Sequence, residues 1–146
     1  MQARALMQLL GYAGLLPFLA ALLGTLLLHD YTAGLSRQAF VIYSLAILCF
    51  LAGTLWGSAI NYPQKPKLLR LLISNGIVIF AVLGILTAQQ VLATILLMIG
   101  YMALLWYERN SSGTAGWYPR LRARLTWLAV VLHVLFIATL IARNGG

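Results

Sequence analysis

The stretch Asn61-Tyr62-Pro63-Gln64-Lys65-Pro66-Lys67 separates two long apolar runs, which cover about residues 38–60 and 68–87. Its two prolines interrupt the hydrogen bonding of a continuous helix, and its two lysines are too costly to bury in hydrocarbon. Each flanking run is long enough, at about 1.5 Å per residue, to cross a hydrocarbon core of ~30 Å. We therefore interpret this stretch as a loop between two transmembrane helices.

Three further apolar runs have a similar character and cover about residues 8–28, 91–106 and 125–141. We expect the first to remain as a membrane anchor, because it is longer than the apolar part of a signal peptide and no clear cleavage site follows it. The short segment 88–90 joins the third and fourth runs as a tight hairpin. The sequence thus predicts an all-α, polytopic membrane bundle of five transmembrane helices.

The composition is that of a membrane protein along the whole chain. Of its 146 residues, 62% are hydrophobic and 8% are charged, and the mean hydropathy is +0.93. Five spans of about 20 residues leave loops too short for a separate soluble domain. We treat residues 1–146 as a single integral membrane domain, and we predict no nucleic-acid partner despite the net charge of +8.

Basic residues fall mainly on one side of the predicted bundle. Eight lie in the N-terminal tail and in the second and fourth connections: Arg4, Lys65, Lys67, Arg70, Arg109, Arg120, Arg122 and Arg124. Only Arg37 and Arg143 lie on the other side. Because basic loops are retained in the cytoplasm, this distribution predicts an N-in, C-out orientation.

Small residues predict where helices pack closely. Gly53 and Gly57 form a GxxxG motif in the second span, and Ala20 and Gly24 repeat this spacing in the first. Both pairs suit either packing within the bundle or a homodimer seam. Trp56, between the two glycines, is a candidate for the interfacial aromatic belt or for the wall of a ligand pocket.

Several polar or unusual residues inside the spans are candidates for a ligand site or pathway. Asn75 lies beside Gly76 and suits a hydrogen bond between helices or contact with a small polar substrate. Pro17 predicts a kink in the first span, with a hinge or an exposed carbonyl as a further reading. His133 lies near the bilayer midplane and is either a structural or a functional group. With Tyr43, it could frame a lipid or quinone pocket.

We predict no metal site and no cofactor. His29 ends the first span, whereas His133 lies roughly 15 Å deeper, so the two cannot share a haem. The lone Cys49 and two distant histidines do not supply a set of three or four metal ligands. The sequence offers no pair of side chains for acid–base catalysis either. It therefore favours a protein that is not an enzyme.

Arg120, Arg122 and Arg124 precede the last span at the predicted cytoplasmic surface. Guanidinium groups at this position suit anionic lipid head groups. We therefore predict that the partners of the protein include membrane lipids, anionic lipids among them.

Three stretches carry a resemblance to a known family: residues 10–18 (LGYAGLLPF), 50–57 (FLAGTLWG) and 117–122 (WYPRLR). Together they resemble the uncharacterised membrane family of transmembrane protein 69 and its bacterial relatives, grouped around a domain of unknown function. The resemblance implies an energy-conserving membrane, either bacterial inner or mitochondrial inner, and we predict the bacterial inner membrane. It brings no activity and no catalytic residues.

These observations favour a multi-pass inner-membrane protein that acts by contact, either as an accessory or assembly partner of a larger complex or as a homo-oligomer. A small oligomeric transporter or channel is the first alternative, with Pro17, Asn75 and His133 along the path. Five spans do not divide into equal inverted halves, which weighs against it. A membrane enzyme that binds a lipid or quinone is the second alternative.

Overall fold

A computed structural model describes residues 2–61, 67–87, 89–112 and 116–144. The regular structure in these ranges is helical: α1 (Gln2–Ala13), α2 (Leu16–Leu27), α3 (Asp30–Asn61), α4 (Lys67–Thr87), α5 (Gln90–Ser112) and α6 (Trp117–Asn144). Segments α1 and α2 together form one membrane-length unit, Gln2–Leu27. The described chain thus has five helices long and apolar enough to cross a membrane, which confirms the predicted number.

Several helices extend further than the apolar runs predict. Helix α3 begins at Asp30 instead of near residue 38, and α5 continues to Ser112 through the polar segment that we expected to be a loop. The reason is that apolar length marks only the part of a helix in hydrocarbon. Polar and basic residues prolong the helix beyond it, where backbone hydrogen bonding continues within the helix.

The first span is broken, as Pro17 predicts. The chain turns at Gly14 and Leu15, and Pro17 lies in the first turn of α2, where its missing N–H costs no helical hydrogen bond. The hydroxyl of Tyr43 in α3 donates a hydrogen bond to the carbonyl oxygen of Gly14 at 2.7 Å. A carbonyl group at the break is thereby satisfied without water, as membrane depth requires.

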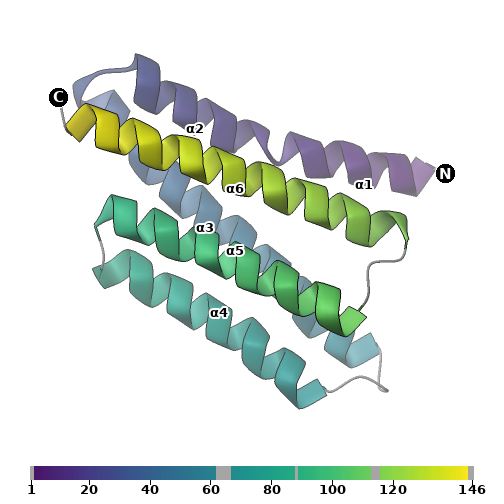
Figure 1. The fold of residues 1–146 in the computed structure, drawn as a ribbon. Coiled ribbons are helices and arrows are strands. Elements are labelled where there is room, and N and C mark those ends of the chain that lie inside the picture. The colour runs from purple at the N-terminus through teal and green to yellow at the C-terminus, as the bar shows by residue number, and fades with distance from the viewer. Residues whose placement is uncertain (1, 62–66, 88, 113–115, 145–146) are drawn as a thin grey trace.

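The helices run up and down, and Figure 1 shows how they associate. Helix α2 packs against α3 and α6, α3 also packs against α4 and α5, and α5 packs against α6, whereas α1 lies along α6. The N-terminus, the end of α3, the start of α4, the end of α5 and the start of α6 lie at one end of the molecule. We call this the N-terminal end of the bundle.

The core is apolar and close-packed. Its fully buried members include Phe18, Phe40, Leu48, Leu97, Phe136 and Leu140. Glycines bring helices together at particular points: a methyl group on Gly100 of α5 would lie 2.9 Å from Leu48 of α3, and one on Gly84 would lie 2.8 Å from Leu96. Many large apolar side chains face outward, as expected of a surface in contact with lipid.

Candidate functional site

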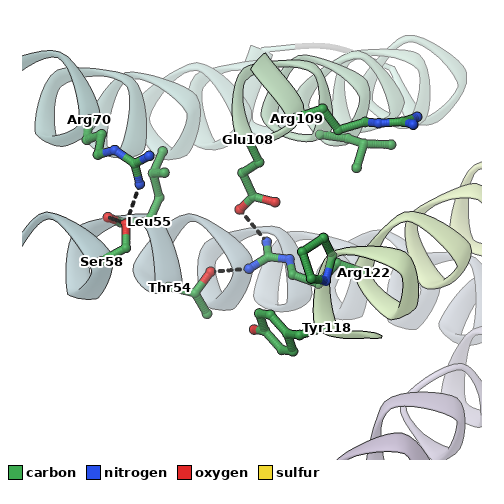
Figure 2. A pocket seen from close by; sticks show the side chains of 10 residues that line it. Thr54, Leu55, Ser58, Arg70, Glu108, Arg109, Tyr118 and Arg122 are labelled. Carbon is green, nitrogen blue, oxygen red and sulfur yellow. Dashed lines mark hydrogen bonds and ion pairs between the residues drawn. The ribbon is translucent and has the colours of Figure 1, made fainter. Parts of the chain in front are cut away.

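An ion pair links two helices at the N-terminal end of the bundle. Arg122 of α6 and Glu108 of α5 lie 2.6 Å apart, Nη2 to Oε1, and both side chains are mostly buried. Arg122 also donates a hydrogen bond to the hydroxyl of Thr54 in α3. Figure 2 shows these side chains pointing toward one another from three different helices.

A second arginine approaches the same face of α3. Arg70 of α4 is only 1% exposed, and its Nη1 donates a hydrogen bond to the Ser58 hydroxyl at 2.6 Å (Figure 2). Thr54 and Ser58 are four residues apart, so their hydroxyl groups lie on one face of the helix. This face therefore holds two guanidinium groups that come from different helices.

These groups surround a cavity of about 160 Å³. Its walls include three arginines, Arg70, Arg109 and Arg122, and one acid, Glu108. The sequence contains one other acid, Asp30, which begins α3 at the opposite end of the bundle. The cavity thus has an excess of positive charge, which attracts anionic groups. An anionic group would compensate it.

A larger and mostly apolar cavity, of about 390 Å³, adjoins the first. It lies between α1, the break, α3 and α6, and Tyr118 and Arg122 line both cavities. Its other walls are Met7, Leu10, Gly11, Gly14, Leu15, Phe18, Ile47, Phe50, Leu51, Tyr101, Leu121, Leu125, Thr126 and Ala129. We refer to the two as the arginine cavity and the apolar cavity.

The three arginines that we expected to act together are separated by the structure. Residues two apart on a helix are rotated by about 200°, so Arg122 faces the bundle while Arg120 and Arg124 face away from it. Arg120 and Arg124 line a third cavity of about 120 Å³ with Arg4. The guanidinium of Arg4 lies 5.1 Å from the ring centre of Trp117. A role in head-group binding stays a prediction for all three.

His133 lies in the core, with no exposed surface. Its Nδ1 is 2.6 Å from the carbonyl oxygen of Ala129, which can only accept, so Nδ1 carries the proton. In the neutral imidazole, Nε2 is then the acceptor for the Ser44 hydroxyl, 2.6 Å away. The Tyr101 hydroxyl donates to the Ser44 carbonyl oxygen at 2.7 Å, and α3, α5 and α6 meet in this network. His133 lines none of the three cavities described above.

The other candidates for a ligand pathway do not all converge. Pro17 and Asn75 are exposed, and the Asn75 amide donates to the carbonyl of Leu71 in its own helix at 2.9 Å. Trp56 is 43% exposed on the outer surface of α3. The Tyr43 hydroxyl donates its hydrogen bond to the Gly14 carbonyl oxygen at the break in the first span. Tyr43 thus lies near Pro17, and the ring of Phe18 is 4.8 Å from that of Tyr43 and 5.4 Å from that of His133, centre to centre. Asn75 and Trp56 take no part in this group.

The predicted packing residues fall into two groups. Gly24 lies against Ser36 of α3, so a methyl group there would collide with the serine side chain. A methyl group on Gly53, Gly57 or Gly76 would meet no described atom within 4 Å. Ala20 is exposed as well. Close packing inside the chain therefore uses Gly24, whereas the other three glycines are open to the surroundings.

Sequence reasoning missed the acid and the partners of Arg122. From the sequence, Glu108 is only an acid after the fourth apolar run, and Arg70 is only one of the basic residues that predict the orientation. One signal was available: Thr54 and Ser58 share a helical face near the basic end of their span. In the described ranges, His, Cys, Asp and Glu side chains form no group of three that could hold a metal ion.

The comparisons with known proteins bear on family alone. Residues 3–138 match the family described as "Protein of unknown function (DUF3429)". The chain belongs to the DUF3429 family. No curated protein and no solved structure matches it. The matched range of this DUF3429 protein contains all residues of the arginine cavity. The narrower resemblance to transmembrane protein 69 stays a prediction.

Proposed function

We propose that this DUF3429 protein is a multi-pass inner-membrane protein that acts as an accessory or assembly scaffold, through contacts of its helices with a partner helix and with lipids. The observation that carries this proposal is the open glycine face of α3. Gly53 and Gly57 are one helical turn apart, and neither meets a described atom within 4 Å of a methyl group placed on it. Such a face lets another backbone approach closely.

Glycine on a lipid-facing surface needs a reason. It costs about 1 kcal/mol of helix stability relative to alanine, and lipid tails gain nothing from the missing side chain. On α3 the two glycines flank an outward-facing Trp56, and Phe50 lies exposed one turn earlier. A partner helix that fits between these aromatic side chains would make use of the groove that the glycines leave. The partner is a second copy or a subunit of a larger complex.

The orientation is part of the same proposal. The described basic residues at the N-terminal end of the bundle include Arg4, Arg70, Arg109, Arg120, Arg122 and Arg124. A cytoplasmic location for this end follows from the retention of basic loops, with the C-terminus on the opposite side. In a bacterium, the membrane concerned is the inner membrane.

Transport receives less support from the geometry. Pro17 and Asn75 are exposed, and the hydrogen-bonding groups of His133 are used inside the core. A path through one chain would have to include groups that the fold keeps apart. Ligand binding, in contrast, is favoured by a specific observation, namely the apolar cavity beside the arginine cavity.

Extraction from native membranes in a mild detergent, followed by mass measurement of the intact complex, tests the scaffold proposal. We expect the wild type to exceed the mass of one chain and Gly53→Leu to reduce it to that mass, because the leucine fills the groove. Gly34→Leu is the matched control, since Gly34 lies on the same helix and is equally open. A monomeric wild type, or the same loss in both variants, would contradict the proposal.

A further inference from the structure

The break in the first span creates a wedge between helices. After the break, α2 packs against both α3 and α6. Before it, α1 lies along α6 (Figure 1). The C-terminal half of α3 diverges from α1 in the same view. The apolar cavity of about 390 Å³ occupies this wedge, with Gly14 and Leu15 of the break in its wall.

The wedge is open toward the surroundings of the bundle. Leu10 of α1 and Phe50 of α3 line the cavity, yet they are 61% and 68% exposed. On a membrane-spanning bundle, such side chains face the hydrocarbon region. Along α6 the cavity extends from Tyr118 to Ala129, roughly 16 Å at about 1.5 Å per residue. An apolar chain can therefore enter sideways from the bilayer and lie along α6.

The polar end of this cavity leads into the arginine cavity. Arg122 and Tyr118 belong to both walls, and the guanidinium carbon of Arg122 lies 6.0 Å from the Tyr118 ring centre. Beyond them lie Arg70 and Arg109, and Glu108 is the one acid in the wall. Figure 2 shows the Arg109 side chain extending away from the ion pair. Since Arg109 is also exposed, we place it at the rim of the arginine cavity.

We propose that the two cavities form a single site for an anionic amphiphile, with a phosphate-type head group among Arg70, Arg109 and Arg122 and one apolar chain in the wedge. Guanidinium groups match the planar, bidentate geometry of phosphate oxygens. Arg122 holds its place through Glu108 and Thr54, so the site is preorganised before the ligand arrives. Phe50 borders both this site and the open glycine face of α3, but Gly53, Trp56 and Gly57 line neither cavity, so either proposal can fail alone.

Three probes separate the contributions of head group and chain. Oleoyl lysophosphatidic acid carries both, monooleoylglycerol has the chain without the phosphate, and inorganic phosphate has the charge alone. Native mass spectrometry of the purified protein in an uncharged detergent measures the occupancy of each. We expect oleoyl lysophosphatidic acid to bind at least about tenfold more tightly than either of the others.

Each other result would overturn the proposal. Equal binding of monooleoylglycerol would mean that the arginine cavity recognises no head group. Equal binding of inorganic phosphate would mean that the site takes free phosphate and that the wedge is not used. Absence of binding by all three probes would mean that no such site exists.

A matched pair of variants tests the wedge. Leu10→Trp places an indole at the mouth of the cavity, whereas Leu9→Trp places the same side chain on the neighbouring position of α1, which is 66% exposed and lines none of the described cavities. Both positions are open, so neither change disturbs the core. We expect Leu10→Trp to weaken binding of oleoyl lysophosphatidic acid by about fivefold and Leu9→Trp to leave it unchanged. An equal effect of both would refute a site in the wedge.

A second pair tests the head group. Arg109→Gln removes a charge from the rim of the arginine cavity, and Arg124→Gln removes the same charge from another face of the same end. We expect the first to weaken binding by about threefold and the second to have no effect. If both weaken binding equally, the attraction is that of the basic surface as a whole, and a defined head-group site is excluded.

Discussion

His133 joins three helices through groups that are all buried. Its ring accepts a hydrogen bond from the Ser44 hydroxyl of α3, and Tyr101 of α5 donates one to the carbonyl oxygen of the same serine. The rings of Phe18 and Phe40 lie 5.4 and 5.0 Å from the imidazole, centre to centre. A polar group so enclosed contributes specificity, because any other helix register would leave it unsatisfied.

This arrangement predicts a strong asymmetry between single and double substitutions. Ser44→Ala leaves Nε2 of His133 buried without a donor and should lower the free energy of unfolding by about 1–3 kcal/mol. Adding His133→Leu removes the unsatisfied group and should recover much of that loss. Unfolding in detergent followed by circular dichroism measures both. If the double variant lost the sum of the stabilities lost by the two single variants, Ser44 and His133 would not be coupled.

The ion pair behaves in a similar way, at the N-terminal end of the bundle. Glu108→Gln leaves the mostly buried Arg122 without its counter-charge and should destabilise the protein by about 1–3 kcal/mol, since both groups keep some contact with the surroundings. The double variant Glu108→Gln, Arg122→Gln should be closer to the wild type. If Glu108→Gln alone proved neutral, the pair would have no structural role.

The role of a single residue could be predicted where it depends only on its own helix, and not where it depends on residues of other helices. The break just before Pro17 was predicted, because a proline inside a continuous helix lacks an N–H and its ring clashes with the preceding turn. The inward direction of Arg122 depends on where α6 begins and on a glutamate in another helix. The hydropathy pattern predicts neither of these. The position of Arg122 beside Glu108 is therefore known only from the structure.

At the scale of elements, the packing of helices depends on which glycines meet a neighbour. Gly100 of α5 lies against Leu48 of α3 in the core, whereas Gly76 of α4 faces outward. Apolar length predicts that the spans exist, because only hydrocarbon-long runs can cross. It does not predict which helix faces meet. Packing in lipid depends on small residues and interhelical hydrogen bonds, and the sequence places such residues on inward and outward faces alike.

A pair of glycine substitutions checks this distinction. Gly100→Leu inserts a side chain where a methyl group would already be 2.9 Å from Leu48, and we expect a loss of about 1–3 kcal/mol of stability from overpacking. Gly76→Leu has open space and should change stability by less than about 0.5 kcal/mol. Thermal unfolding in the same detergent compares them, and a reversed order would contradict the assigned packing.

The molecule as a whole is a bundle of helices with many apolar side chains on its outer surface and a cluster of basic residues near its N-terminal end. Its up-and-down course brings the N-terminus together with the ends of α3 and α5, as alternate crossing of five spans requires. This part of the fold could be predicted from the order of apolar runs. The cavities could not, because they depend on how far α1 and α3 diverge.

Orientation is a property of the whole chain and can be measured with reporter fusions in a bacterium. Alkaline phosphatase folds only outside the cytoplasm, so a fusion after Asn144 should be active and one after Asn110 inactive, if basic residues set the topology. A fusion after Thr87 serves as a second external control. The opposite pattern would reverse the proposed orientation and place the arginine cavity on the outer side.

Helix α1 contributes no buried residue to the core, and it is joined to the rest of its span through the turn at Gly14 and Leu15. Its tilt can therefore change without disturbing the packing of the other helices. Transmembrane segments adjust their tilt to the thickness of the bilayer that surrounds them. We therefore expect the width of the wedge between α1 and α3 to depend on bilayer thickness, through the tilt of α1.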